Sequence, residues 1–532
     1  MSENKLPQIP KEWRWVKLEE VSYLITDGTH KTPKYQEKGV RFISIANIKP
    51  FEPINWEAYE KYISYEEHLE LIKRAKPEKD DILFPRIGTL GFAKRIDFDE
   101  EVSIFVGLGL VKPIKKYVLP KYIEYYMNTP YVNKYSHEKA TGTGRLTLPL
   151  HASKSMPFPL SPLPEQQKIV EILEEAFSKI DAGVEGLKKI KKLLSLYRQS
   201  VLKNAFEGKL TEKWRKENKE KLEPAEKLIE KIKKEREERY QQELEEWKKA
   251  CEIAKKEGKK KPPKPKPPKE LPPITEEELK NLPEIPREWR WVRLGEVGTI
   301  YSGGTPSTKI PEYWGGEIPW ITPADLSVYK QKYISKGRKS ISRLGLENSS
   351  AVLMPAGTVL FSSRAPIGYV AIASNPVSTN QGFKNIYPYK SILSDFIYYY
   401  LKFAKELIEN MGSGTTFKEV SAKIFNLIPF PLLSLSEQQK IVEEIEYRLS
   451  IADKLEETVD KLLEKAEKLK QSYLKSAFEG KLTEEWRKQN LHLITGENSV
   501  DKLLGKIKAE KEKFEKQKKK PKVKQKSLIG TK

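Results

Sequence analysis

The chain has 532 residues, a formal net charge of +22 and a sequence pI of about 9.4, which together favour a polyanionic partner. This length is enough for two or more globular cores. The single cysteine, Cys251, excludes an internal disulfide and a cysteine-based zinc cluster, and the five histidines show no metal-ligand spacing. The opening residues lack the apolar run of a signal peptide, so we expect a soluble cytoplasmic protein without a metal site.

The first globular segment, residues 1–160, begins with PQIPKEWRWVKL at positions 7–18. Apolar runs predict strands at 40–46, 81–84 and 103–111, and an aromatic helix is predicted around 122–127. Because strands and helices are mixed, we expect an α/β or α+β domain, called here the first head.

A long helix is predicted over residues 161–218, with Gly208 where it would stop. About forty residues at a rise of about 1.5 Å per residue would make a rod roughly 60 Å long. Apolar or small residues recur at alternating steps of three and four, which indicates a coiled-coil seam. The seam positions are Leu173, Ala176, Ile180, Gly183, Leu187, Ile190, Leu194, Tyr197 and Val201.

A charged helix at 223–257 and the sequence GKKKPPKPKPPKELPP occupy the next segment, residues 219–280. The proline and lysine content forbids a packed core and predicts an extended, semi-rigid linker. The opening motif then returns as PEIPREWRWVRL at 283–294 and begins the second head, residues 281–432. Strand-like runs lie at 358–361 and 369–373, and a helix is predicted at 394–410.

A second long helix is predicted over residues 433–490, because 437–490 repeats 165–218 without a gap at an offset of 272 (437 minus 165). About half of the aligned residues are identical, and so long a period indicates duplicated domains rather than a solenoid. A charged arm and a basic tail follow at 491–532. The second seam comprises Ile445, Arg448, Ala452, Leu455, Val459, Leu462, Ala466, Leu469 and Tyr473.

The predicted fold class is therefore α+β, with two mixed α/β heads alternating with two long helices that pair as a coiled coil. The motifs that flank the heads are similar, whereas the interiors of the heads differ strongly. This pattern is expected where a constant scaffold carries recognition domains that are free to change.

Catalytic motifs are not supported by their context. The FVGLG sequence at 105–109 resembles a cofactor-binding glycine motif, but it runs into a strand-like stretch that is stopped by Pro113. Asn128-Thr129-Pro130-Tyr131 resembles the tetrapeptide with which adenine methyltransferases hold a flipped base, but its second residue is wrong. The sequence has no GxxxxGK[ST] loop for ATP. We expect a chain that is not an enzyme and has no cofactor of its own.

With the repeat and the divergent heads taken together, the chain resembles the specificity subunit of type I restriction-modification systems. The second head carries the similarity in YSGGTPSTKIPEYWGGEIPWITPADL at 301–326, GTVLFSSRAPIGYVAI at 357–372, STNQGF at 378–383 and GSGTTFKEV at 412–420. The first head matches through DGTHKTPKY at 27–35, LFPRIG at 83–88 and GTGRLTL at 142–148, and it departs from the pattern where the second head has NQG.

The resemblance implies that each head is a target recognition domain for one half of a bipartite site in double-stranded DNA. Antiparallel long helices would set the unread spacer between the half-sites. Two modification (methyltransferase) subunits and further restriction subunits would bind S-adenosylmethionine, ATP and magnesium. The AFEGKLTE repeats at 205–212 and 477–484 would serve docking, although helix capping alone explains their glycines. The docking and coiled-coil positions are Leu173, Ile180, Leu187, Leu194, Phe206, Gly208, Leu455, Leu462, Leu469, Phe478 and Gly480.

Base edges are read by side chains that donate or accept hydrogen bonds, while phosphate contacts fix the register. Each candidate Arg or Lys is equally compatible with a phosphate-only or fully solvated position. The DNA-binding candidates are Thr29, His30, Lys31, Lys34, Arg86 and Arg145 in the first head, and Thr305, Ser307, Thr308, Arg364, Gln381, Thr415, Thr416 and Lys418 in the second.

Other classes of protein stay open beside this interpretation. A modification-only or other phage-defence complex would use the same kind of chain with different partners. A coiled-coil scaffold that does not bind DNA would explain the helices but not the two divergent heads. An enzyme that joins recognition and catalysis in one chain would need a cofactor-binding glycine motif and a base-holding tetrapeptide, and the sequence context does not support either.

Overall fold

The computed structural model describes residues 6–29, 32–256, 258, 261–262, 264–265, 267–414 and 418–519. The chain forms two compact units, each assembled from segments far apart in the sequence. Unit 1 comprises residues 1–188 and 460–532, and unit 2 comprises residues 189–459. Each head therefore shares its unit with parts of both long helices.

The first head contains two small sheets. One is antiparallel in the order β2-β8-β5-β6, with strands Ser22–Asp27, Leu108–Pro113, Ile82–Pro85 and Lys94–Arg95. The other is mixed in the order β4-β3-β7, with strands Tyr62–Ile63, Val40–Ile43 and Val102–Ile104. The strand predicted at 103–111 is thus wrong as a single element, because a turn at 105–107 passes the chain from β7 in one sheet to β8 in the other.

Aromatic residues fill the core of the first head, where the fully buried Trp13, Tyr122, Tyr126 and Phe158 lie in one cluster. A pair of strands, β1 (Arg14–Lys17) and β9 (Pro157–Leu160), closes the head at the point where the long helix begins. Its helices are α1 (Tyr65–Leu71), α2 (Pro120–Met127), α3 (Pro130–Lys139) and α4 (Leu150–Lys154).

The second head has a five-stranded sheet in the order β11-β18-β15-β16-β13 and a three-stranded sheet in the order β14-β12-β17. The first consists of Gly298–Ser302, Phe383–Pro388, Val359–Ser363, Ile367–Ala373 and Tyr333–Ile334. The second consists of Lys339–Ile341, Trp314–Ile321 and Ser378–Thr379, while β10 (Arg290–Arg293) pairs with β19 (Pro429–Leu432) as β1 pairs with β9. Helix α8 (Glu276–Lys280) lies at the end of the linker, and the helices of the head are α9 (Pro323–Leu326), α10 (Arg343–Glu347), α11 (Ser394–Phe403), α12 (Lys405–Met411) and α13 (Ala422–Asn426).

The two long helices, α5 (Leu163–Phe206) and α14 (Leu435–Phe478), each end just before a glycine. Gly208 and Gly480 have φ angles of +71° and +70°, so they adopt the left-handed conformation that commonly ends a helix. A Cβ on Gly480 would lie 2.3 Å from Pro10 Cγ, and one on Gly208 would lie 2.3 Å from Pro286 Cγ. The short helices α6 (Glu212–Glu217) and α15 (Glu484–Gln489) follow.

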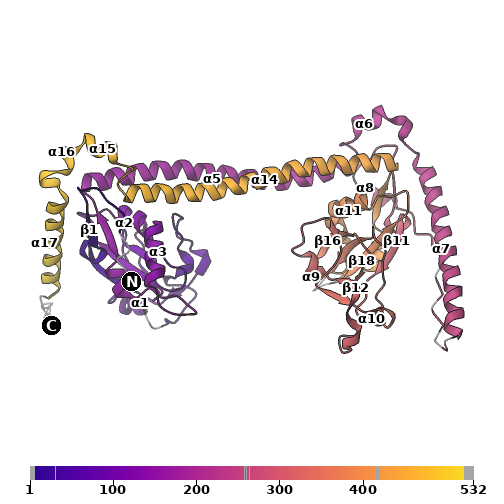
Figure 1. Cartoon of the computed structure of the whole chain (residues 1–532), viewed down its shortest axis with the longest axis horizontal. Helices are drawn as coiled ribbons and strands as arrows, with labels where there is room; N and C mark the ends of the chain where they lie inside the picture. Colours follow the sequence, from indigo (N-terminus) through magenta and orange to yellow (C-terminus); the bar gives the residue numbers. More distant parts are fainter. Residues whose placement is uncertain are drawn as a thin grey trace, which may run out of the picture. The chain divides into compact units, whose positions relative to one another are not determined.

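Within each unit a segment of α5 runs antiparallel to a segment of α14 (Figure 1). In unit 1, Asp181 accepts a hydrogen bond of 2.5 Å from Lys470 Nζ, and Glu165, earlier on α5, accepts one from Arg487, beyond the end of α14. In unit 2, Arg198 contacts Asp453 at 2.5 Å, and Thr211 bonds to Glu437 at 2.7 Å. The order of partners reverses along the two helices, as antiparallel pairing requires.

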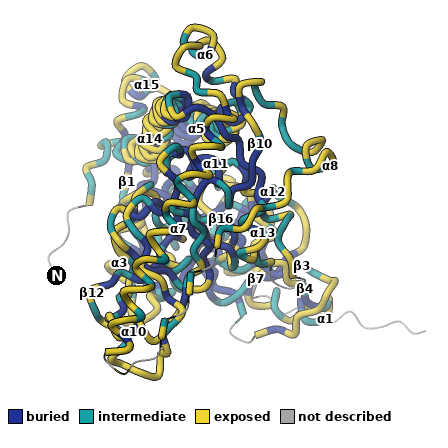
Figure 2. Tube along the Cα trace, turned by 90° about the vertical axis from the view of Figure 1, so that its right-hand side faces the viewer, coloured by how far each residue is buried: buried dark blue, intermediate teal, exposed yellow. Residues whose placement is uncertain are grey.

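The seam differs from the prediction at one of its two alternating positions. One series of seam positions, which includes Leu173, Leu194 and Val459, is buried as predicted. At the alternate series, the residue that faces the other helix is the one after the predicted residue. Arg198 and Lys470 occupy these facing positions, and each pairs with an aspartate of the other helix. The prediction of apolar seam residues at this series was therefore wrong by one residue. Of the predicted seam residues, Gly183, Ile190, Tyr197, Leu455, Leu462 and Leu469 are exposed. Figure 2 colours much of α14 as exposed.

Two charged arms pack against the heads. In unit 2, α7 (Ala225–Lys256) buries Leu228 and Ile232, and Arg239 lies over the rings of Tyr387 and Tyr389 at 4.8 and 4.5 Å. In unit 1, α17 (Val500–Lys519), which follows α16 (Leu491–Ile494), buries Leu503 and Ile507 and places Phe514 against Tyr23. Among the described residues, no helix combines the length and the apolar character that crossing a membrane would need.

The end of the proline-rich linker is held by an ion pair. Arg293 Nη1 and Nη2 donate to the two carboxylate oxygens of Glu278 at 2.8 Å each, and they also donate to carbonyl oxygens of the linker and of the second head. The Arg293 side chain is 5% exposed. The last part of the linker is therefore fixed to the second head.

Candidate nucleic-acid interface

Three loops of the second head meet around Ser363, the last residue of β15, which is fully buried. Its backbone N–H donates to the carbonyl oxygen of Gly382 at 2.8 Å, and its own carbonyl oxygen accepts from Val420 N at 2.9 Å. This brings the turn at 364–366, the turn at 380–382 and the end of the loop near 419 to one edge of the head. We call this arrangement the three-loop frame.

The first head contains the same frame around Arg86. The backbone N–H of Arg86 donates to Gly107 O at 2.8 Å, and its carbonyl oxygen accepts from Leu148 N at 2.7 Å. The strand registers agree, because Pro85 faces Leu108 as Ser362 faces Phe383. Two heads with divergent sequences therefore share one backbone arrangement at this edge.

A carboxylate lies between two cations in the frame of the second head. Glu419 Oε2 is 3.6 Å from Arg364 Nη1, and Glu419 Oε1 is 3.9 Å from Lys384 Nζ. Burial lowers the pKa of the Lys384 ammonium, Glu419 raises it in part, and Arg364 lowers it further. The Arg364 side chain is 37% exposed, so it can reach an anion or a base edge from a fixed position.

Gln381 projects from the turn at 380–382 and is exposed. The Thr305 hydroxyl donates to its side-chain carbonyl oxygen, which fixes the direction of the amide. Thr305 itself follows a well-anchored segment, since Gly304 N donates to Thr379 O at 2.8 Å and Trp320 Nε1 donates to Gly304 O at 2.9 Å. The predicted residues Thr305, Arg364 and Gln381 are thus brought to one edge of the head.

The remaining candidates have varied positions. Ser307, Thr308 and Lys418 are exposed in the second head, whereas Thr415 and Thr416 lie outside the described residues. In the first head, Arg145 is exposed on the loop that ends at Thr147, and Lys34 is exposed with its backbone N–H donating to Glu67. Thr29 bridges to Phe105 beside the frame, and His30 and Lys31 also lie outside the described residues.

Arg86 has a different position from the one expected of a base-reading residue. Its side chain is 11% exposed, its Nε donates to Leu148 O at 3.1 Å, and its guanidinium pairs with the buried carboxylate of Asp27. We therefore reassign Arg86 from DNA contact to holding the frame. Arg74 shares Asp27 through a bond of 3.1 Å from its Nε, and its side chain is 49% exposed. No sequence motif marked Arg74.

Several residues proposed for partner docking are instead buried within their own unit. Phe206 and Gly208 in unit 2, and Phe478 and Gly480 in unit 1, are enclosed by the ends of the long helices and the heads. Leu173 and Leu194 are buried in the seams, and Ile180 and Leu187 are half-buried. Of the proposed docking residues, Leu455, Leu462 and Leu469 are exposed.

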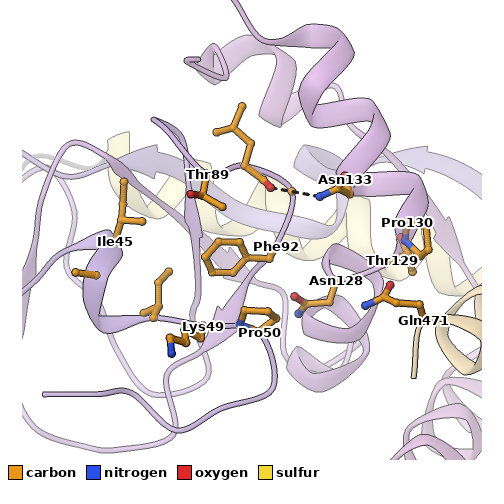
Figure 3. A pocket seen from close by; sticks show the side chains of 14 residues that line it. Ile45, Lys49, Pro50, Thr89, Phe92, Asn128, Thr129, Pro130, Asn133 and Gln471 are labelled. Carbon is orange, nitrogen blue, oxygen red and sulfur yellow. Dashed lines mark hydrogen bonds between the residues drawn. The ribbon is translucent and has the colours of Figure 1, made fainter. Parts of the chain in front are cut away.

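A groove of about 700 Å³ in unit 1 includes part of the Asn128-Thr129-Pro130-Tyr131 tetrapeptide (Figure 3). The Asn128 amide is fully engaged, because its Oδ1 accepts from Ala93 N at 3.2 Å and its Nδ2 donates to Ala93 O and Glu124 O. Thr129 caps α3 by accepting from Val132 N. These side chains therefore join α2 and α3 to the sheet, and the amide is not available to hold a base.

Comparison with known proteins identifies the family. Residues 10–192 and 286–465 match the family model described as the type I restriction modification DNA specificity domain. The chain belongs to this family. The matched ranges contain nearly all of both heads, with their three-loop frames, and the first part of each long helix, so the family resemblance seen in the sequence motifs is confirmed.

Relatives of the specificity-domain family extend over different parts of the chain. The specificity subunit of the type I restriction enzyme MjaIX of Methanocaldococcus jannaschii is 43% identical over 175 residues, which cover 32% of this chain and 40% of that protein. The EcoDI specificity subunit of Escherichia coli is 27% identical over 353 residues, covering 65% of this chain and 67% of that protein. The match thus spans less than half of the length of the MjaIX relative.

A solved structure supports the fold. A chain from a study of complex assembly and conformational transition of the type I R-M system matches with a TM-score of 0.52 and 19% identity, covering 89% of this chain and 99% of that one. At this level of identity the similarity shows that the two chains share the specificity-domain fold.

Proposed function

We propose that this chain is the DNA sequence-specificity subunit of a type I restriction-modification complex, in which each head binds one half of a bipartite site in double-stranded DNA. The observation that carries the proposal is the three-loop frame, which has the same backbone hydrogen bonds in both heads and different side chains. A recognition protein needs such a combination, because constant geometry sets the approach to the duplex while side chains choose the bases.

The charge of the chain supports a duplex partner. With a net charge of +22, the protein is attracted to the phosphate backbone, and Arg145 and Lys418 are exposed beside the frames. Phosphate contacts of this kind position a protein on DNA without selecting a sequence. The paired helices would hold the two heads at a set separation and leave the bases between the half-sites unread.

Docking of two modification subunits is supported by exposed apolar residues at equivalent positions of the repeat. Ile190 and Tyr197 on α5 are 38% and 39% exposed in unit 2. Leu462 and Leu469, which lie 272 positions later (462 minus 190) on α14, are 43% and 47% exposed in unit 1. Each unit therefore offers the same two positions, once from each long helix, as two copies of one partner would require.

Methyl transfer and cleavage would be carried out by the partner subunits in this proposal. The Asn128 amide is hydrogen-bonded to the backbone of Ala93. The 105–109 sequence forms a turn and the start of β8, whereas a cofactor-binding glycine motif would lead into a helix. S-adenosylmethionine would bind the modification subunits, and ATP with magnesium would bind restriction subunits.

Co-expression with a modification subunit, followed by single-molecule sequencing of adenine methylation in host DNA, tests the proposal. A bipartite methylated motif with a fixed unread gap is the expected result. A stable complex that leaves no motif would contradict the function and favour a scaffold that does not bind DNA. Methylation without cleavage of unmethylated DNA, in the presence of every candidate restriction subunit, would favour the modification-only complex.

A further inference from the structure

The three-loop frame makes individual residues of the two heads comparable, including those where the first head departs from the NQG sequence of the second. The residue after the central one of each frame is Ile87 in the first head and Arg364 in the second. The facing residue is Thr147 in the first head and Glu419 in the second.

A further pair follows from the hydrogen bonds to Gly107 and Gly382. These glycines accept equivalent backbone bonds from Arg86 and Ser363, so the residues before them, Val106 and Gln381, occupy the same place. Val106 and Ile87 are half-buried, Arg364 is half-buried and Gln381 is exposed.

The second head has polar side chains at these equivalent positions, and backbone hydrogen bonds fix the turn that carries Gln381. Asn380 Oδ1 accepts from Gly382 N at 3.0 Å, and Asn380 N donates to Ile321 O at 3.0 Å, so the turn that carries Gln381 is fixed on both sides. Thr305 orients the amide and Glu419 orients the guanidinium. An amide matches N6 and N7 of adenine, and a guanidinium matches O6 and N7 of guanine.

The first head has apolar side chains at two of the three equivalent positions, Ile87 and Val106, and Thr147 at the third. Ile87 and Val106 can donate no hydrogen bond from their side chains, and their half-exposed methyl groups can contact the C5-methyl group of thymine. The two heads therefore share the backbone geometry at these positions but offer different side-chain groups to the DNA.

We propose that the positions 87/364, 106/381 and 147/419 determine specificity, with purine N7 edges read by the second head and thymine methyl groups read by the first. The inference rests on the proposed function, because it names how each half-site is distinguished. It also predicts that exchanging residues between the paired positions exchanges the type of readout.

The test begins with the full chain bound to its modification subunits and a random-sequence duplex library, which gives the bipartite motif. Variants Gln381→Val and Val106→Gln then carry the exchange, and Gln331→Val is the matched control, an exposed glutamine before the far-edge strand β13. We expect Gln381→Val to lose preference in one half-site by about 5- to 150-fold, while the other half-site and the gap stay unchanged. Val106→Gln should alter the other half-site, and Gln331→Val neither.

Base analogues test the chemistry with the unaltered protein. Replacing adenines of the second head's half-site by 7-deazaadenine should weaken binding of the wild type and have no further effect on Gln381→Val, because Gln381 is the residue assigned to adenine N7. Replacing thymidine by deoxyuridine in the first head's half-site should weaken the wild type. Unchanged melting temperatures of the variants would show that the heads remain folded.

Failure of the inference and failure of the proposed function are distinguishable. A wild-type motif that both exchanges and both base analogues leave unchanged overturns the inference and keeps the function. A wild-type complex that enriches no sequence overturns both.

Discussion

Arg487 Nε donates a hydrogen bond of 2.9 Å to Glu165 Oε1 across 322 positions of the sequence. Glu165 is fully buried and also accepts from Trp13 Nε1 and Thr483 Oγ1 at 2.7 Å each. The three donors come from the first head and from the segment that follows α14, so one carboxylate joins the parts of unit 1. In unit 2, Glu437 does the same with Trp289, Thr211 and Arg215. The repeated EQQ, KLTE, EWR and WRK sequences supply these residues in both copies.

Arg487→Met should destabilise unit 1 by about 3–5 kcal/mol, because it leaves the Glu165 carboxylate buried without its charged partner. Lys488→Met is the matched control, since the Lys488 side chain is 60% exposed and should change stability by less than about 0.5 kcal/mol. Hydrogen exchange measured by mass spectrometry should show faster exchange in residues 1–188 and 460–519 than in unit 2. Equal protection in both variants would contradict the role of Arg487.

The seam register predicts different effects of one substitution at two nearby leucines of α14. Leu474 is fully buried and Leu469 is 47% exposed. Leu474→Ala should cost about 2–5 kcal/mol of unfolding free energy, whereas Leu469→Ala should cost less than about 0.5 kcal/mol. Urea unfolding followed by circular dichroism measures both. The reverse order would restore the seam predicted from the heptad pattern.

Leu469→Asp should leave the isolated chain folded and weaken binding of one modification subunit, because a charge replaces an exposed apolar group at the proposed docking position. Native mass spectrometry should then show complexes with one modification subunit in place of two. Tyr197→Asp, at the equivalent position of the repeat, should affect the other subunit. Lys468→Asp, next to Leu469 and 74% exposed, is the control. Complexes of unchanged stoichiometry in both apolar variants would move the docking surface elsewhere.

Acid should weaken the attachment of the linker to the second head. Hydrogen bonds from Arg293 lower the pKa of the Glu278 carboxyl to about 2, with burial opposing that shift. A carboxyl whose pKa is lower in the folded state contributes its full stability above its ordinary pKa, and it loses that contribution as pH falls toward about 2. The stability difference between the wild type and Glu278→Gln should therefore shrink between about pH 5 and pH 2. A difference that grows toward acid would contradict this assignment.

Arg364→Ala should weaken binding through the second half-site by about 1–3 kcal/mol and spare the first. Arg343→Ala is the control, because Arg343 is exposed on α10 and pairs with Glu347 of the same helix. Titrations of cognate and scrambled duplexes at several salt concentrations measure both effects. Equal losses on the two duplexes would reduce Arg364 to a phosphate contact.

The sequence determined the repeat, the two long helices, the two mixed heads and the family, because these depend on local periodicity and on motifs within single segments. Helix ends were also predictable, since Gly208 and Gly480 provide the backbone conformation that stops a helix. The chain order of these elements needs no tertiary contact to be inferred.

Tertiary structure decided which segments belong together and which side chains face outward. The apolar pattern could not reveal that Lys470 and Arg198 lie in the seams, because a charge becomes acceptable there only when an aspartate of the facing helix pairs with it. The sequence motif favoured Arg86 as a DNA contact, because the ion pair between Arg86 and Asp27 forms only in the folded head. The equivalence of Val106 and Gln381 likewise rests on backbone hydrogen bonds between strands, which are indifferent to side-chain identity and leave no matching sequence to find.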